Sequence, residues 1–157
     1  MIKKNTKNFT LIEILISVSI LSIAAVALGW QMKNMISAHH FYKDMNHLVT
    51  DLRKSQLIAL SDRSDIGVKI YREKEGYSYQ FQSDCPLPFF ITKRVKLTGV
   101  REIKQNHKPV QQLFLSIYST GRIEPCQEIE FIQNETRSLI LDLKSPLIIE
   151  LKRVDLL

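Results

Sequence analysis

Glu13 is the residue of this chain whose position most needs a chemical explanation. It is the one charged residue in an apolar run, residues 9–30, and about 20 apolar residues in a helix span the hydrocarbon core of a bilayer. A charged side chain inside that core costs on the order of 2.5–3.5 kcal/mol on insertion scales. We therefore expect Glu13 to have a cationic partner. The eight residues before the run include three lysines, Lys3, Lys4 and Lys7.

This segment resembles the amino terminus of type IV pilins and of the pseudopilins of type II secretion. The residues that carry the resemblance are the basic leader 1–8 and then Phe9, Thr10, Leu11, Ile12 and Glu13. It implies that a prepilin peptidase cuts between Asn8 and Phe9 and that the new Phe9 amine is methylated. It also makes Glu13 the fifth mature residue, an assembly contact for the first-residue amine of a neighbouring subunit. Asn8 departs from the glycine of the family, although asparagine also tolerates left-handed backbone.

Two other interpretations fit a basic start followed by apolar residues. One is an ordinary secretory signal peptide cut after Ala27, since Ala25-Val26-Ala27 could serve as a small-residue cleavage site. The other is a plain single-span anchor. Glu13 and the length of the run disfavour the signal peptide, whose apolar region is uncharged and usually 7–15 residues long.

Charge and cysteine content indicate where the body of the chain resides. The 157 residues carry a net charge of +6, but without residues 1–8 the balance is 19 basic to 16 acidic residues, so the basic pI is weak support for nucleic-acid binding. Lysines before the span place the amino terminus in the cytoplasm and the rest across the inner membrane. There a disulfide between Cys85 and Cys126 could persist. This disulfide would close a loop of about 42 residues and contribute about 4 kcal/mol to the free energy of unfolding. The alternative is that the two cysteines are unrelated buried thiols.

The apolar run continues into an amphipathic helix without a break. Beyond Trp30, apolar side chains recur in steps of three and four, at Met32, Met35, Ile36, Phe41, Tyr42, Met45, Leu48, Val49 and Leu52. Polar residues such as Lys43, Asp44, Asp51 and Arg53 fall largely between them. We predict one helix from Phe9 to about Leu60. A removed signal peptide needs no such continuation, whereas a pilin-like subunit does.

Period-two alternation replaces the helical pattern after Ser64. Residues 66–71 and 77–82 alternate about a turn at 73–76 and predict a β-hairpin. Six further strands are expected at 90–97, 100–104, 110–118, 127–132, 138–143 and 147–153. The predicted class is α+β: a long N-terminal transmembrane and amphipathic helix followed by an antiparallel β head of two packed sheets.

A second resemblance lies within the head. Residues 113–122 resemble the strand, turn and arginine of H-type (FimT-like) minor pseudopilins, although Gly121 is explained equally well as a turn glycine with positive φ. DNA-uptake relatives have another arginine two residues after Arg122, where this chain has Glu124. That difference disfavours a DNA receptor. We expect no metal site, cofactor or enzymatic motif.

Together these features predict four segments: a leader (1–8), a membrane half-helix (9–30), an amphipathic half-helix packing on the head (31–62) and the β head (63–157). The expected protein is a minor pseudopilin that assembles with other pseudopilins at the inner-membrane secretion platform and can contact exported cargo. The rivals are a minor type IV pilin for adhesion, motility or DNA uptake, a membrane-anchored periplasmic binding or enzymatic domain, and a secreted β domain.

Overall fold

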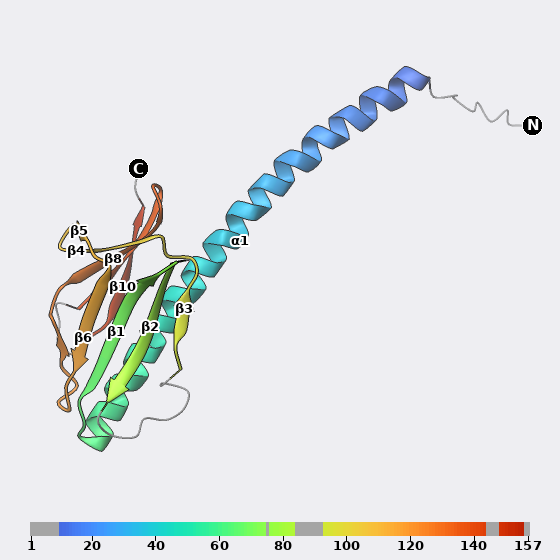
Figure 1. Ribbon diagram of the computed structural model, residues 1–157. Coiled ribbons are helices and arrows are strands. Elements are labelled where there is room, and N and C mark those ends of the chain that lie inside the picture. The colour runs from blue at the N-terminus through green and yellow to red at the C-terminus, as the bar shows by residue number, and fades with distance from the viewer. Residues whose placement is uncertain (1–9, 75, 84–92, 144–147, 156–157) are drawn as a thin grey trace, which may run out of the picture. The chain divides into compact units, whose positions relative to one another are not determined.

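The long helix and the β head predicted from the sequence are both present. The computed structural model describes residues 10–74, 76–83, 93–143 and 148–155 (Figure 1). The chain divides into two compact units, Met1–Ser37 and Ala38–Leu157, and a single helix, α1 (Leu11–Asp62), contributes to both. Two antiparallel sheets follow α1, so the predicted α+β class is confirmed.

Ten strands are described after the helix. They are β1 (Ile66–Glu73), β2 (Gly76–Ser83), β3 (Val95–Leu97), β4 (Glu102–Gln105), β5 (Lys108–Pro109), β6 (Gln112–Ile117), β7 (Ile123–Glu124), β8 (Glu128–Asn134), β9 (Arg137–Asp142) and β10 (Glu150–Asp155). Sheet A has the order β3-β2-β1-β6-β7 and sheet B the order β10-β9-β8-β4-β5. The predicted hairpin is β1–β2, with Ile66 opposite Ser83.

Both sheets turn their apolar faces toward a common core with the helix. Alternate side chains of a strand point to opposite faces of the sheet, and the strand centres show that alternation: Val68 and Ile70 of β1 are buried, as are Leu113 and Leu115 of β6. On sheet B, Phe131 of β8 is fully buried in the same apolar cluster. One core therefore holds the two sheets and the second half of α1 together.

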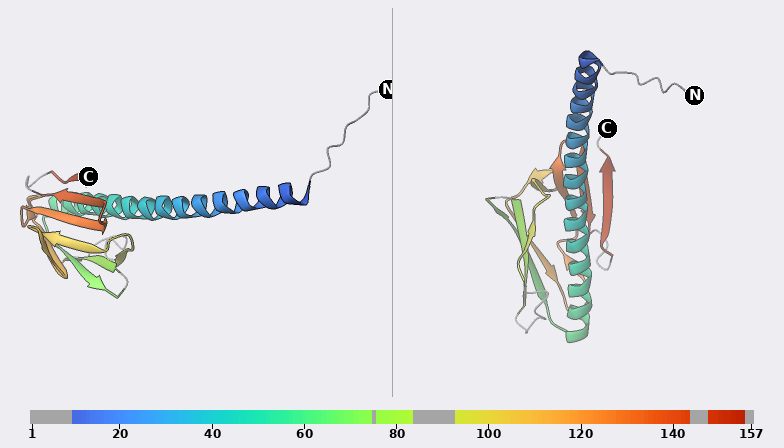
Figure 2. Two further views of the ribbon diagram at one scale, coloured as in Figure 1. Left: turned by 90° about the horizontal axis from the view of Figure 1, so that it is seen from above. Right: turned by 90° about the vertical axis from the view of Figure 1, so that its right-hand side faces the viewer.

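The second half of α1 packs on both sheets through this core. In the right-hand view of Figure 2, β1 and β2 appear on one side of it and the edge strand β10 on the other. Its buried residues recur in steps of one, three and four: Phe41, Met45, Leu48, Val49, Leu52, Ser55 and Ala59. Met32, Met35 and Ile36, which continue the same stripe toward the amino terminus, are exposed.

Two carboxylates of α1 attach it to the head through hydrogen bonds. Asp44 accepts from the backbone N–H of Gly99 (3.1 Å) and from the Thr98 hydroxyl (3.2 Å). Asp51, two turns further on, accepts from the hydroxyl of the fully buried Tyr79 on β2 (2.7 Å). The expectation that these two polar residues merely separate apolar positions is therefore incomplete, because both contact the head.

The Tyr79–Asp51 contact predicts a loss of stability in alkaline solution. Burial, followed by the hydrogen bond to Asp51 and the negative charges of Asp51 and Asp44, raises the pKa of Tyr79 above its ordinary value of 10.0. The folded state therefore holds the Tyr79 hydroxyl proton more tightly than the unfolded state does. The stability that this contributes is complete below about pH 10 and is lost as the pH rises beyond that value. The free energy of unfolding, from urea denaturation of the full chain in detergent, should fall more between pH 8 and 11 for the wild type than for Tyr79→Phe.

Tyr118→Phe is the matched control for that measurement. The hydrogen bond and charge of Glu124 raise the pKa of Tyr118 as well, but this tyrosine is less buried. At pH 8 the Tyr79→Phe variant should already be about 1–3 kcal/mol less stable, because Asp51 loses its donor. Identical alkaline slopes for the wild type and both variants would contradict the assignment.

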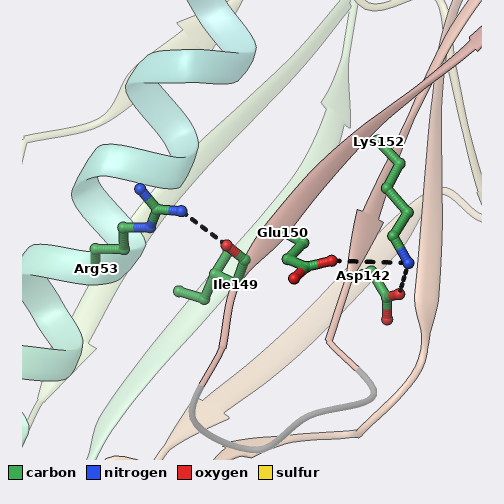
Figure 3. A network of polar contacts seen from close by, with 5 residues as sticks. All are labelled: Arg53, Asp142, Ile149, Glu150 and Lys152. Atoms are coloured by element: carbon green, nitrogen blue, oxygen red, sulfur yellow. Dashed lines mark hydrogen bonds and ion pairs between the residues drawn. The ribbon is translucent and has the colours of Figure 1, made fainter.

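The edge strand β10 is held to the head by a small polar network (Figure 3). Arg53 of α1 donates to the carbonyl oxygen of Ile149 (2.8 Å), just before β10. Lys152 on β10 lies 2.5 Å from Asp142 on β9 and 3.8 Å from Glu150. The hydrogen bond to Asp142 raises the pKa of the Lys152 ammonium, so Lys152 keeps its charge at neutral pH.

The strand predictions were right for most elements, with shifted ends. The expected strands at 100–104, 110–118, 127–132, 138–143 and 147–153 correspond to β4, β6, β8, β9 and β10. The strand expected at 90–97 is described only as Val95–Leu97, because 84–92 lie outside the described residues. The two-residue strands β5 and β7 were not predicted.

Candidate functional site: the amino-terminal cap of α1

Thr10 and Glu13 form a reciprocal cap at the start of α1. The backbone N–H and the hydroxyl of Thr10 both donate to Oε2 of Glu13, at 2.9 and 3.0 Å. In return, the backbone N–H of Glu13 donates to the Thr10 hydroxyl oxygen at 3.3 Å. This is a capping box, in which the residue before the helix and the third helical residue satisfy each other's backbone donors. Glu13 therefore has a defined partner within its own chain.

The cap uses only one oxygen of the Glu13 carboxylate. Both Thr10 donors bond Oε2, and within the described residues no donor contacts Oε1. The carboxylate also lies at the positive end of the helix dipole, where a negative charge is stabilised. The arrangement fixes the side chain and, among the described residues, leaves Oε1 without a donor.

The helix beyond Glu13 has the properties of a segment surrounded by lipid. The large apolar side chains from Leu11 to Ile36 are more than half exposed, and α1 is the one helix of the described chain that is long and apolar enough to cross a membrane. Its hydroxyls are satisfied locally: Ser17, Ser19 and Ser22 each donate to the carbonyl four residues earlier, at 2.7–2.8 Å. Such internal bonding is what hydrocarbon requires of polar groups.

Three of the predicted site residues lie outside the described residues. These are Asn8 and Phe9, at the predicted cleavage and methylation site, and Cys85 of the predicted disulfide. Cys126 is exposed, and its Sγ lies 3.3 Å from the carbonyl oxygen of Ile123. Cleavage, methylation and the pairing of Cys85 with Cys126 stay predictions.

The Gly121-Arg122 turn has the geometry expected of it but not the electrostatics of a phosphate site. Gly121 has φ = 78°, as predicted for a turn glycine, and its carbonyl accepts from Gln56 of α1 at 2.6 Å. The guanidinium of Arg122 is paired with Glu124 at 3.0 Å. An incoming phosphate would have to displace that carboxylate.

The capping role of Thr10 could have been inferred from the sequence. Thr10-Leu11-Ile12-Glu13 has the Ser/Thr-x-x-Glu spacing of a capping box ahead of an apolar run. The prediction that Glu13 contacts a neighbouring subunit overlooked the capping role that its side chain performs within the single subunit.

Fold and site together define a class of protein: an α+β protein with a long apolar amino-terminal helix, capped by a carboxylate and followed by an antiparallel head. Residues 4–29 match the family model described as the prokaryotic N-terminal methylation motif. The match covers 26 of the 157 residues and shows the amino-terminal motif itself. No curated protein and no solved structure matches the chain.

Proposed function

We propose that this chain is a non-enzymatic filament subunit, a minor pseudopilin of type II protein secretion, with the H type as its closest subclass. The methylation motif over residues 4–29 supports the pilin-like part of this proposal. The observation that carries the mechanism is the position of Glu13, which is the only charged residue from Leu11 to Met32 and is capped by Thr10. The H-type assignment rests on the resemblance of residues 113–122.

The proposed mechanism is mechanical. Cleavage after Asn8 creates a new amine at Phe9, and the apolar half of α1 keeps the subunit in the inner membrane with its head in the periplasm. During assembly the Phe9 amine of a neighbour approaches the free oxygen of Glu13. The ion pair between this amine and Glu13 is most stabilising where water is excluded. At the same time, packing between apolar half-helices replaces packing against lipid. The Thr10 cap orients the carboxylate for that encounter.

The mature amino terminus is the most direct test of the proposal. Expressed with a prepilin peptidase, the chain should lose residues 1–8 and begin with methylated Phe9. Mass spectrometry of the intact purified protein measures both changes, since methylation adds about 14 Da to the trimmed chain. Without the peptidase the full 157-residue chain should persist. A mature chain that begins at Leu28 would instead establish an ordinary signal peptide.

A minor type IV pilin is the nearest alternative, because the same motif serves both classes. Neighbouring genes for a secretin and a secretion ATPase, without retraction ATPases, would favour the secretion role. The Arg122–Glu124 pair disfavours DNA uptake through the Gly121-Arg122 turn. DNA binding by the head that weakens steeply with salt, as phosphate contacts do, would support uptake instead.

A further inference from the structure

Gly67 occupies a position in sheet A where the fold does not need a glycine. It lies in β1, the central strand of the sheet, and is paired with Gln82 of β2 and Ser116 of β6 in a regular register without a bulge. A Cβ added at Gly67 would have the Gln82 carbonyl oxygen as its nearest atom, at an ordinary 3.6 Å. A glycine inside a strand weakens the strand and often marks a bulge or the close approach of a ligand or of another backbone. Because neither a bulge nor another described backbone explains Gly67, a ligand is the remaining reason.

The missing side chain leaves a trough on the outer face of sheet A. The strands β2, β1 and β6 lie side by side (Figure 1), and exposed Gln82 and Ser116 flank Gly67 in one row across them. A pocket of about 290 Å³ opens at this row, and Asp65 and Tyr118 also line it. We call this pocket the Gly67 trough. Ligand pockets begin at about 300 Å³, so the trough suits one ring or one group of a longer chain.

Hydrogen bonds hold one end of the Gly67 trough in a fixed shape. The carboxylate of Asp65 accepts from the backbone N–H of Ser119 at 2.7 Å, and the hydroxyl of Ser83 donates to the Asp65 carbonyl oxygen at 3.0 Å. The hydroxyl of Tyr118 donates to the carboxylate of Glu124 at 3.1 Å. These side chains are in place before a ligand arrives, and a ligand that binds there does not have to order them.

The polar groups of the Gly67 trough suit hydroxyl groups better than charged groups. Amide and hydroxyl side chains flank its floor, and both kinds can donate and accept hydrogen bonds, as a sugar hydroxyl does. Its lining contains one acidic residue, Asp65, and the next row along β1 contains one basic residue, Lys69. Beside it, Glu124 is paired with Arg122 at 3.0 Å. The trough therefore has no excess of one charge that would select a phosphate or a basic peptide.

An aromatic ring stands next to the trough on the same face of the sheet. Phe114 of β6 lies opposite Lys69, one row along from Gly67, and its side chain is 56% exposed. The Lys69 ammonium lies 5.4 Å from the centre of the Phe114 ring, a contact that holds the ring in place. The electron-rich face of an aromatic ring attracts partly positive C–H groups, such as those on the face of a sugar ring. Rows are about 7 Å apart along a strand, close enough for neighbouring rings of one chain.

We propose that the Gly67 trough and Phe114 together bind a glycan, a chain of uncharged sugar rings. One ring lies over Gly67 and exchanges hydrogen bonds with Gln82 and Ser116, and a neighbouring ring stacks on Phe114. An extended peptide would instead add to the edge of a sheet, where backbone groups are unpaired, and β1 has a strand on either side. The inference goes beyond the proposed function and does not depend on it, because it concerns a ligand of the single head.

Titration of the purified full chain with soluble oligosaccharides tests the proposal. The probes are cellotetraose, which presents hydroxyls alone, and tetra-N-acetylchitotetraose, which adds amide groups. The chain is kept in lauryldimethylamine oxide, since detergents with sugar headgroups would compete for the site. Isothermal titration calorimetry should detect binding of at least one tetraose with a Kd of about 1 mM or tighter.

Two substitutions should weaken this binding without unfolding the head. Gly67→Thr fills the floor of the trough with a residue that strands favour, and it should raise the Kd about tenfold or more because the ring is displaced. Gly67→Ala adds less volume and should have a smaller effect. Phe114→Ala should raise the Kd about tenfold through the loss of stacking. The control is Leu57→Ala, which removes another exposed apolar side chain, on α1, and should leave the Kd unchanged.

Each result either supports the glycan site or overturns it. The inference is wrong if neither tetraose binds at millimolar concentration, or if Gly67→Thr and Phe114→Ala bind as the wild type does while melting at the same temperature. An equal loss in Leu57→Ala would also contradict it. An oligonucleotide that binds with steep salt dependence, where the tetraoses do not, would replace the glycan with nucleic acid. None of these results changes the mature amino terminus, so the glycan site and the proposed function fail separately.

Discussion

Glu13→Ala and Glu13→Gln should both abolish incorporation into filaments while membrane insertion stays normal. Removing one partner of a buried ion pair costs about 3–5 kcal/mol, which corresponds to a loss of about 10²–10⁴-fold in association. Insertion should not suffer, because both substitutions remove a charge from the apolar half of α1. The measurement compares the amount of each variant in membranes with the amount in sheared filaments, after co-expression with the partner subunits.

The cap makes Glu13→Gln the more informative of the two variants. Glutamine can also complete a capping box, so Glu13→Gln keeps an acceptor for Thr10 and removes only the charge. Thr10→Ala does the reverse, because the carboxylate stays and the hydroxyl contacts at 3.0 and 3.3 Å are lost. If charge pairing drives assembly, Glu13→Gln should fail as completely as Glu13→Ala, and Thr10→Ala should be only partly defective. Normal assembly of Glu13→Gln would contradict the proposed function.

The helix could be predicted from sequence because it depends on local and periodic signals. An uninterrupted apolar run, followed by apolar residues in steps of three and four, predicted a helix that ends near Leu60. The helix ends at Asp62. The same periodicity could not show where packing begins. Met35 and Phe41 belong to one stripe, but Met35 is exposed and Phe41 is fully buried, because burial depends on which part of the helix the sheets reach.

The sheets were predictable as strands but not as an arrangement. Alternation in β1, β2 and β6 reflects one buried face, which the sequence displays directly. The pairing of β1 with β2 was predicted as a hairpin, but the pairing of β1 with β6 depends on contacts between residues far apart in the chain. The short strands β5 and β7 are too brief to alternate. The contacts of Asp44 and Asp51 were missed for the same reason, since their partners lie on β2 and in the turn after β3.

Gly99→Ala should destabilise the head more than the addition of one methyl group suggests. In the turn after β3, a Cβ added at Gly99 would lie 2.6 Å from Cα and 2.9 Å from the backbone N of Phe41 on α1. These are backbone atoms of a packed helix, so no side-chain rotation can relieve the clash and the turn must move away from α1. The movement would also lengthen the 3.1 Å hydrogen bond from Gly99 N–H to Asp44.

We expect Gly99→Ala to lower the free energy of unfolding by about 3 kcal/mol and the melting temperature by about 10 °C, measured on the full chain in detergent by circular dichroism. Gly67→Ala on β1 is the matched control, because its added Cβ would lie 3.6 Å from the nearest atom, the Gln82 carbonyl oxygen, which is ordinary contact. That variant should melt within about 2 °C of the wild type. Equal melting temperatures for the two variants would show that a methyl group fits between the turn at Gly99 and the backbone of α1. A lower melting temperature for Gly99→Ala alone would identify this turn as a point where the amphipathic half of α1 is fixed to the head.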